Sequence, residues 1–87
     1  MKTTIQAHPN PFLSSIKVEV TTEQTQHNII RLFDAAGRFI RIFSWRLQPG
    51  TNIATMSDLH VLANGVYFLD IIDHNAQVLH KTQIQKH

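Results

Sequence analysis

Short runs of residues alternate between apolar and polar side chains along nearly the whole chain, and turn residues separate these runs. Ile16, Val18 and Val20 alternate with Lys17 and Glu19, which is the pattern of a strand with one face buried and one face in water. Similar runs follow, and no long helical pattern interrupts them. The expected strands are residues 15–20, 28–34, 39–44, 51–56, 66–72 and 77–84. This spacing predicts an all-β fold, a small antiparallel β-sandwich of six or seven strands.

The remaining segments complete this outline. Residues 1–8 are expected to form a leader or linker that can add one edge strand at Ile5, and residues 9–87 to form the domain. Residues 57–62 are expected to form a short helical turn capped by Ser57.

Size and composition limit what the chain can be. Its 87 residues predict a single domain, and a 43% apolar content suffices for a core. Cysteine is absent, which excludes disulfides and thiolate metal sites. The net charge of +2 comes without a cluster of Lys and Arg, which argues against binding to nucleic acid or an anionic membrane surface. No run approaches the roughly 18 apolar residues of a spanning helix, which argues against direct membrane insertion. Residues 1–6 lack the apolar stretch of a signal peptide, so we expect a piece from the end of a longer exported precursor.

A hairpin is predicted at the centre of the chain. Asp34-Ala35-Ala36-Gly37-Arg38 suits a three-residue loop with Gly37 in the left-handed conformation. Simple counting from that loop sets Phe33 opposite Phe39, Leu32 opposite Ile40, Arg31 opposite Arg41 and Ile30 opposite Ile42.

This register divides the hairpin into two faces. Leu32, Ile30, Ile40 and Ile42 are expected to face the core, while Ile29, Phe33, Phe39 and Phe43 lie on the other face with Arg31 and Arg41. Aromatic residues on a face exposed to water have two explanations. Loops or a neighbouring strand cover the patch, or it is a surface for a partner, formed by Phe33, Phe39, Arg41 and Phe43.

Six histidines and two Asp–His pairs raise the question of metal binding and catalysis. The histidines lack the spacing of paired ligands and no acidic cluster accompanies them, so no metal site is expected. Asp58 with His60, and Asp73 with His74, have no serine in a strained turn and no oxyanion loop beside them, so no catalytic site is expected.

Two further segments set backbone shape where strands begin. Pro9 and Pro11 fix φ and hold their neighbours in extended geometry, so that Phe12 enters the core as the next strand starts. Near the other end, Asn64 and Gly65 form a turn before an apolar strand that begins with Val66.

In this order, and with the hairpin between them, these segments resemble the C-terminal sorting domain of type IX secreted proteins in Bacteroidota. The resemblance covers roughly residues 7–87. The residues that match the family's motifs are Pro9, Asn10, Pro11 and Phe12 at the start, Asp34, Gly37 and Arg38 in the hairpin, Gly65 and Tyr67 near the end, and the lysines of the last strand, Lys81 and Lys86. His8 and Ala76 depart from the pattern, since the family favours an aromatic residue and the glycine of an Asn-Gly turn there.

The resemblance implies an Ig-like sandwich of about seven strands and a function as a non-catalytic export signal without a cofactor. Such a domain is recognised by the outer-membrane type IX translocon and removed by a sortase-like cysteine peptidase, while a cargo domain precedes it. It implies passage through the periplasm to the outer-membrane surface or the extracellular space, with cleavage near or before Ala7. The residues expected to carry recognition are Gly65, Val66, Tyr67, Phe68, Lys81 and Lys86.

Two alternatives belong to other classes. The first is a free-standing Ig-like adhesion or carbohydrate-binding module that uses Phe33, Phe39, Phe43 and Trp45 as stacking platforms. The second, single-stranded nucleic-acid binding through the same aromatics with Arg31, Arg41 and Arg46, is less consistent with the low net charge.

Overall fold

The computed structural model describes residues 4–87, which fold into seven strands and one short 3-10 helix. In chain order the elements are β1 (Thr4–His8), β2 (Ile16–Thr22), β3 (Gln26–Asp34), β4 (Phe39–Leu47), β5 (Gly50–Met56), η1 (Leu59–Val61), β6 (Gly65–Asp73) and β7 (Val78–Lys86). The strands form two antiparallel sheets, one in the order β1-β2-β5 and the other in the order β4-β3-β6-β7. The small all-β sandwich expected from the alternation is confirmed.

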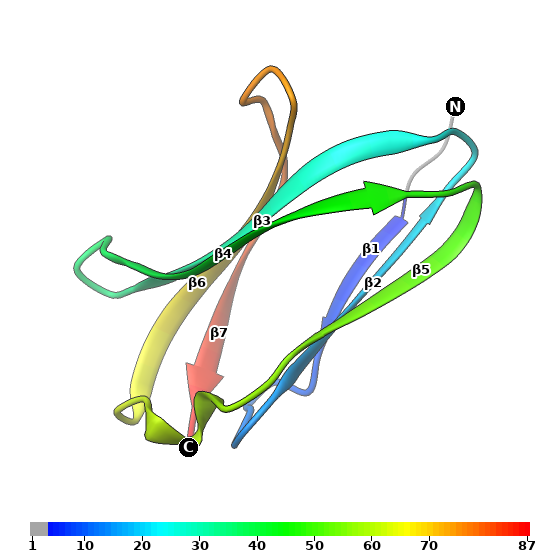
Figure 1. Cartoon of the computed structure of the whole chain (residues 1–87). Coiled ribbons are helices and arrows are strands. Elements are labelled where there is room, and N and C mark those ends of the chain that lie inside the picture. The colour runs from blue at the N-terminus through cyan, green and yellow to red at the C-terminus, as the bar shows by residue number, and fades with distance from the viewer. Residues whose placement is uncertain (1–3) are drawn as a thin grey trace.

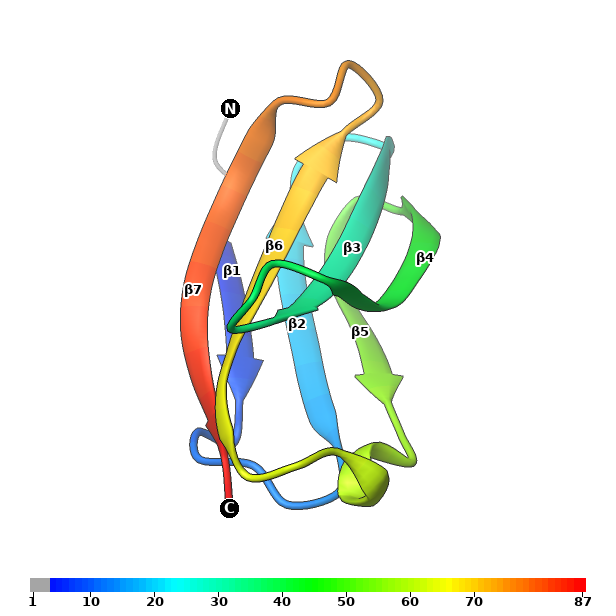
Figure 2. The ribbon, with the colours of Figure 1, turned by 90° about the vertical axis from the view of Figure 1, so that its left-hand side faces the viewer.

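The two sheets face each other, and the chain crosses between them several times (Figure 1). The β3–β4 hairpin extends outward from the four-stranded sheet, away from the three-stranded one (Figure 1). Figure 2 looks onto the outer face of the four-stranded sheet, where the tip of this hairpin lies in front of β6. The N-terminal end of β1 and the C-terminal end of β7 lie at opposite ends of the sandwich.

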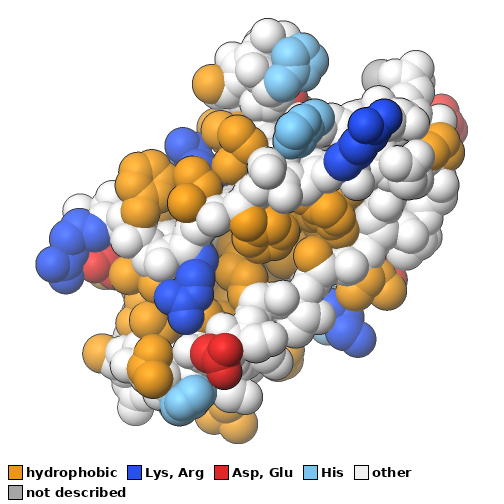
Figure 3. All heavy atoms as spheres, viewed as in Figure 1, with side chains coloured by type: hydrophobic (Ala, Val, Ile, Leu, Met, Phe, Trp, Pro, Cys, Tyr) orange, Lys and Arg blue, Asp and Glu red, His pale blue; other side chains and the backbone are white. Residues whose placement is uncertain are grey.

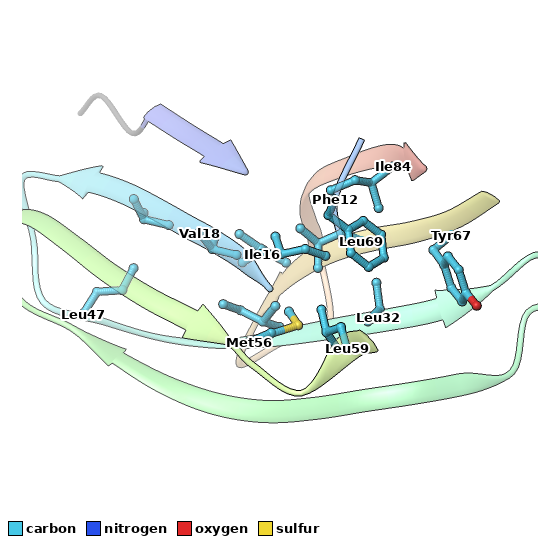
Figure 4. Close-up of a cluster of buried hydrophobic side chains, with 13 residues drawn as sticks. Phe12, Ile16, Val18, Leu32, Leu47, Met56, Leu59, Tyr67, Leu69 and Ile84 are labelled. Atoms are coloured by element: carbon cyan, nitrogen blue, oxygen red, sulfur yellow. The ribbon is translucent and has the colours of Figure 1, made fainter. Parts of the chain in front are cut away.

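The core fills the space between the sheets with side chains from both of them and from the loops at one end (Figure 4). Alternate residues of β2, β3 and β6 supply most of it, as their period of two requires. Its fully buried large residues include Phe12, Ile16, Ile30, Leu32, Leu47, Leu59, Leu69, Ile71 and Ile84. Phe12 comes from the segment before β2 and Leu59 from η1, so both loops help to close this end of the sandwich.

Several boundaries differ from those expected. The edge strand at Ile5 is present as β1, which pairs with β2 from Thr4 opposite Thr21 to His8 opposite Lys17. β4 runs three residues further than expected, to Leu47, and β7 ends at Lys86. Ser57 is not a helix cap: Asp58 precedes η1 in the left-handed conformation, and no side chain caps it.

The predicted register of the β3–β4 hairpin is wrong beyond its first pair. Phe33 pairs with Phe39 as expected, but a bulge then shifts the ladder, so that Leu32 pairs with Arg41 and Arg31 with Ile42. One inserted residue reverses the faces of everything after it, because side chains alternate with a period of two. Ile42 is therefore 59% exposed rather than buried in the core. Phe43 instead packs against the core.

The two hairpin turns of the four-stranded sheet have the same architecture. In the first turn, Asp34 Oδ1 accepts hydrogen bonds from the backbone N–H groups of Ala36 and Arg38, both at 2.9 Å. In the second, Asp73 Oδ1 accepts them from Asn75 at 2.8 Å and Gln77 at 3.0 Å. The fourth residue has a positive φ in each turn, 87° at Gly37 and 64° at Ala76. Ala76 therefore adopts the conformation that a glycine would adopt without strain.

Candidate functional site

The outer faces of the two sheets differ in chemistry. On the three-stranded sheet the outward residues of β2 are Lys17, Glu19 and Thr21, and Ile53 of β5 is the large apolar neighbour beside them. On the four-stranded sheet the outward residues include Phe33, Phe39, Ile42, Phe68 and Val78, together with three charged residues, Arg31, Asp70 and Lys81. Figure 3 shows hydrophobic side chains gathered over the β3–β4 hairpin. It also shows them in the opening between the two sheets, on the side of the molecule where β4 and β5 face the viewer. We call the outward residues of the four-stranded sheet the outer face.

An ion pair with a buried carboxylate lies at the centre of the outer face. Arg31 of β3 and Asp70 of β6 are cross-strand partners, and their side chains form two hydrogen bonds, 2.7 Å from Nε to Oδ1 and 2.5 Å from Nη2 to Oδ2. Asp70 is only 3% exposed, whereas the Arg31 side chain retains access to solvent. The hydrogen bonds to Asp70 raise the pKa of Arg31 above its ordinary value, against the opposing effect of burial.

Aromatic rings surround this ion pair. Phe33 and Phe39 lie with their ring centroids 4.9 Å apart, and the guanidinium carbon of Arg31 is 5.1 Å from the Phe33 centroid and 5.9 Å from that of Phe39. On the other side, the Lys81 ammonium is 5.9 Å from the centre of the Phe68 ring. These distances are within the range of cation–π attraction.

The hairpin tip turns this part of the outer face into a hollow. Ala35 and Gly37 approach from the tip, Phe33 and Phe68 form the walls, and Lys81 and Val78 lie on the β7 side of a space of about 380 Å³. The Arg31–Asp70 pair also borders the space. We call this space the outer-face hollow.

Of the four residues in the expected recognition segment, Gly65 to Phe68, some serve the fold and one lies beside the hollow. Gly65 has a φ of 145°, which favours glycine, at the start of β6. Tyr67 is buried, and its hydroxyl donates a hydrogen bond to the Ala63 carbonyl at 2.7 Å. Val66 is half-buried. Phe68 alone of the four borders the hollow.

The two lysines of β7 have different surroundings. Lys81 is exposed on the outer face beside Phe68. Lys86 is only 7% exposed, and its Nζ donates a hydrogen bond to the His87 carbonyl at 2.8 Å. Its backbone forms an isolated parallel bridge with Phe12. Lysine side chains are usually solvated, but Lys86 is buried.

The Pro-Asn-Pro segment attaches the chain to the outer edge of β7. The Asn10 side chain accepts a hydrogen bond from the Gln85 N–H at 3.0 Å and donates one to the Gln83 carbonyl at 3.4 Å. Phe12 continues the ladder, since its N–H donates to Gln85 O at 2.8 Å and its carbonyl accepts from the His87 N–H at 3.0 Å. Pro9 and Pro11 flank this contact and are exposed. A side-chain amide and one residue of backbone thus cover an edge that would otherwise be open.

The opening and closing motifs meet inside the protein. The rings of Phe12 and Tyr67 contact edge to face with centroids 6.0 Å apart, and Gly65 pairs with Lys86. The two motifs, more than 50 positions apart in the sequence, lie together at the end of the sandwich where β7 stops. We call Phe12, Gly65, Tyr67 and Lys86 the motif cluster.

The hairpin motif holds its own turn. Asp34 forms a salt bridge with Arg38, 2.8 Å from Oδ2 to Nε, in addition to its bonds to the backbone. The backbone N–H of Arg38, followed by the guanidinium of the same residue, lowers the pKa of the Asp34 carboxyl below its ordinary value. Gly37 supplies the positive φ, and Arg38 itself is exposed.

The four residues expected to form one partner surface do not lie together. Phe33 and Phe39 are on the outer face, but Phe43 packs against the core with Trp45, as a consequence of the bulge. Arg41 lies at the β4 edge, where Nη2 approaches the Asp58 carbonyl at 3.4 Å, and it does not face Arg31. The aromatic platform of the adhesion alternative is therefore split between two sides of the sheet.

The Arg31–Asp70 pair and the neighbours of Lys81 were not anticipated from the sequence. Asp70 is the one acidic residue within the apolar run Val66–Ile72, and an acid at such a position signals a buried partner. That signal identifies the acid but not the arginine 39 positions away.

A second cavity lies at the opposite end of the sandwich from the motif cluster. Its volume is about 480 Å³, and residues of the β2–β3 and β6–β7 turns line it together with Ile5 and Asn28. His27 and His74 are among the residues that line it, but in residues 4–87 no three His, Cys, Asp or Glu side chains could together hold a metal ion. Among the same residues, none of the helices is long and apolar enough to cross a membrane.

A family model described as the secretion system C-terminal sorting domain matches residues 6–85. The match includes Asn10, the hairpin turn, Tyr67 and Lys81, so nearly the whole chain contributes to it. No curated protein matches the chain.

Among solved structures, the chain is similar to a β-glucosidase from Listeria innocua, solved in complex with glucose. The identity is 12% and the TM-score is 0.59. The superposition covers 98% of this chain but only 16% of that chain. At this identity the likeness supports the fold alone.

Proposed function

Because the chain belongs to the family of secretion system C-terminal sorting domains, matched over residues 6–85, we propose that the outer-membrane type IX translocon recognises it and that a sortase-like cysteine peptidase removes it. The cargo domain precedes it in the chain and travels through the periplasm to the outer-membrane surface or the extracellular space. The domain is a ligand of the translocon and a substrate of the peptidase, and it carries out no catalysis and uses no cofactor.

The observation that carries this proposal is the family match together with the cluster that its motifs form. Asn10 and Phe12 hold β7, and Phe12 contacts Tyr67, so the family's separate motifs cooperate in one compact unit. A signal that is read as a folded domain needs such a unit, because the machinery must meet the same surface on every cargo.

Recognition is assigned to the accessible members of the expected set, Phe68 and Lys81. Gly65, Tyr67 and Lys86 act by holding the fold, since Gly65 supplies a positive φ and Tyr67 and Lys86 are only 6% and 7% exposed. Val66 is half-buried on β6.

Cleavage is assigned to the chain before Thr4. A peptidase needs its substrate extended and free in the active site. Along β1, from Thr4 to His8, the backbone is paired with β2, and Ala7 is opposite Val18. A cut on the N-terminal side of β1 leaves the sandwich whole.

The test is a fusion of residues 1–87 to the C-terminus of a periplasmic reporter enzyme in a bacterium with a working type IX system. We expect the reporter at the cell surface or in the medium, with the domain removed, and we expect it to stay in the periplasm of a strain that lacks the translocon. Equal retention of the reporter in both strains would contradict the proposal. N-terminal sequencing of the released domain locates the cut.

Deleting residues 81–87 is also expected to trap the reporter. That deletion removes the buried Ile84 and Lys86 as well as Lys81, so it abolishes folding and recognition together. Substitutions at the surface are needed to separate the two.

A further inference from the structure

The outer face of the four-stranded sheet differs from an ordinary solvated strand surface. Phe39 and Ile42 are each 59% exposed there, and Val78 is 55% exposed. The outer face of the other sheet is mainly polar, which is usual for an antiparallel sheet with one wet side. Exposed apolar residues gathered on one face, with aromatic and arginine side chains among them, are typical of protein interfaces.

Some of the charged side chains on this face form ion pairs and one does not. Arg31 occupies both carboxylate oxygens of Asp70, and Asp34 is paired with Arg38. Within residues 4–87, no acidic side chain forms a salt bridge with Lys81, although Asp70 is its cross-strand neighbour. The Lys81 ammonium lies beside the Phe68 ring instead. The outer-face hollow therefore has one positive charge that can pair with an anion from outside the domain.

The hollow is also preformed. The bidentate Arg31–Asp70 pair joins β3 to β6, and the paired Phe33 and Phe68 stand on these same strands. A space of about 380 Å³ is large enough for one or two side chains of a partner. A rigid site loses little entropy on binding.

We propose that the outer-face hollow binds an apolar segment of a partner protein whose carboxylate pairs with Lys81. The partner's apolar side chains pack against Phe33 and Phe68, and its acidic side chain lies over Lys81 at the β7 side of the hollow. This inference rests on the proposed function, in which the partner is a protein of the export machinery, and it specifies the chemistry of that partner's surface.

The first experiment uses the reporter fusion with substitutions on the two sheets. Lys81→Gln and Lys81→Glu are expected to lower the exported fraction, the latter by about tenfold, because a like charge then faces the partner's carboxylate. Lys81→Arg is expected to retain export. Lys17→Glu, an exposed lysine on the outward side of β2, is the matched control and should leave export within about twofold of the wild type.

Phe39 stacks on Phe33 beside the hollow, and a substitution there has its own matched control on the other sheet. Phe39→Ser is expected to lower export, and Ile53→Ser is not, although the two side chains are exposed to nearly the same extent, 59% and 56%. Urea unfolding of each purified variant must give wild-type stability for its export value to count. If another variant unfolds at a lower urea concentration than the wild type, the exported fraction of Lys81→Gln tests the inference. That substitution removes the charge and keeps a polar side chain at an exposed position.

A binding measurement makes the inference independent of export. The purified domain is titrated with the blocked tetrapeptide Leu-Glu-Phe-Glu, with its Gln-for-Glu counterpart and with polygalacturonate, and backbone amide shifts are followed by NMR. We expect shifts at residues 33, 68 and 81 with the acidic peptide and much weaker ones with the neutral peptide.

The outcomes separate the two claims. An exported wild-type reporter with equal effects of Lys81→Glu and Lys17→Glu overturns the inference and leaves the proposed function standing. A wild-type reporter that is not exported overturns the proposed function, and the peptide titration then still decides on the hollow. Shifts produced by polygalacturonate and not by the acidic peptide would assign the hollow to an anionic saccharide and overturn the protein partner.

Discussion

Asn28 is the residue with the least satisfied environment in the core. It lies on the inward side of β3 next to Ile30, it is only 1% exposed, and within residues 4–87 neither its amide nitrogen nor its amide oxygen has a hydrogen-bond partner. A buried amide without partners is unfavourable by about 1–3 kcal/mol. The cavity of about 480 Å³ that Asn28 lines leaves room for a larger apolar side chain.

Asn28→Leu is therefore expected to raise the free energy of unfolding by about 1 kcal/mol, since it removes the unsatisfied groups and adds apolar contacts. Asn52→Leu is the control, because the Asn52 side chain makes hydrogen bonds to Gln48, Gly50 and Val20, and the free energy of unfolding should fall. Urea unfolding followed by circular dichroism measures both. A loss of stability in Asn28→Leu would mean that the amide has a partner, such as an ordered water.

Opposite substitutions in the two hairpin turns test whether the residue at the fourth position has a left-handed backbone conformation. Gly37→Val is expected to lower the free energy of unfolding by about 1–2 kcal/mol, because a β-branched residue is strained at a φ of 87°. A Cβ atom at Gly37 would meet no neighbouring atom of residues 4–87 within 4 Å, which assigns this effect to backbone strain rather than to a clash.

Ala76→Gly is expected to act in the opposite direction and to raise the free energy of unfolding by about 0.5–1 kcal/mol, since it relieves the positive φ of 64° in the matching turn. Both variants are measured by thermal and urea unfolding. Unchanged melting of Gly37→Val would show that the turn does not have this conformation.

At the scale of elements, β7 depends on a segment from the other end of the chain. One edge of β7 pairs with β6, and the other edge is covered near its end by Asn10 and Phe12. Because Asn10 bonds Gln83 and Gln85 through its side chain, it acts as one residue of an added strand. This explains in physical terms why a Pro-Asn-Pro segment accompanies a distant last strand.

Asn10→Ala is expected to lower the free energy of unfolding by about 1 kcal/mol and to speed hydrogen exchange at the Gln85 amide, which loses its acceptor. Asn75→Ala is the control, since within residues 4–87 the Asn75 side chain makes no hydrogen bond and only its backbone N–H is engaged. Exchange at Gln85 that stays as slow as in the wild type would contradict the role given to Asn10.

The hairpin elements also shape the candidate site. The β3–β4 hairpin leans outward over β6 (Figure 2). Phe33 and Phe39 lie on the outer face near its tip, and the bulge beyond this pair turns Phe43 inward. Without the bulge, Phe43 would join the exposed aromatics and Arg31 would face Arg41. Like charges directly opposite are unfavourable, and the observed register avoids them by pairing Arg31 with Ile42 and, on its other side, with Asp70.

At the scale of the whole molecule, the motif cluster and the end cavity lie at opposite ends of an elongated sandwich, 37 Å in its longest dimension. The outer-face hollow lies on the broad side of the four-stranded sheet. β1 begins at the end of the sandwich that carries the cavity, opposite the end where β7 stops.

The amino-acid sequence alone determined the fold class, the strand order along the chain, the conformation of the first hairpin turn and the family. Each of these depends on local patterns: a period of two, proline and glycine geometry, and motifs a few residues long. Because these patterns involve only residues that are close together in the chain, they can be recognised without the tertiary structure.

Only the tertiary structure decided which face each aromatic residue occupies and which charges are paired. The bulge between the Phe33–Phe39 and Leu32–Arg41 pairs lets Phe43 pack toward the core on the same side as Leu32, which packing against the other sheet favours and the hairpin sequence alone does not specify. Arg31 meets Asp70, and Lys86 becomes buried against Phe12, through contacts between residues 39 and 74 positions apart. Such pairings are selected by packing over the whole core, where a shift of one residue would move every side chain to the wrong face.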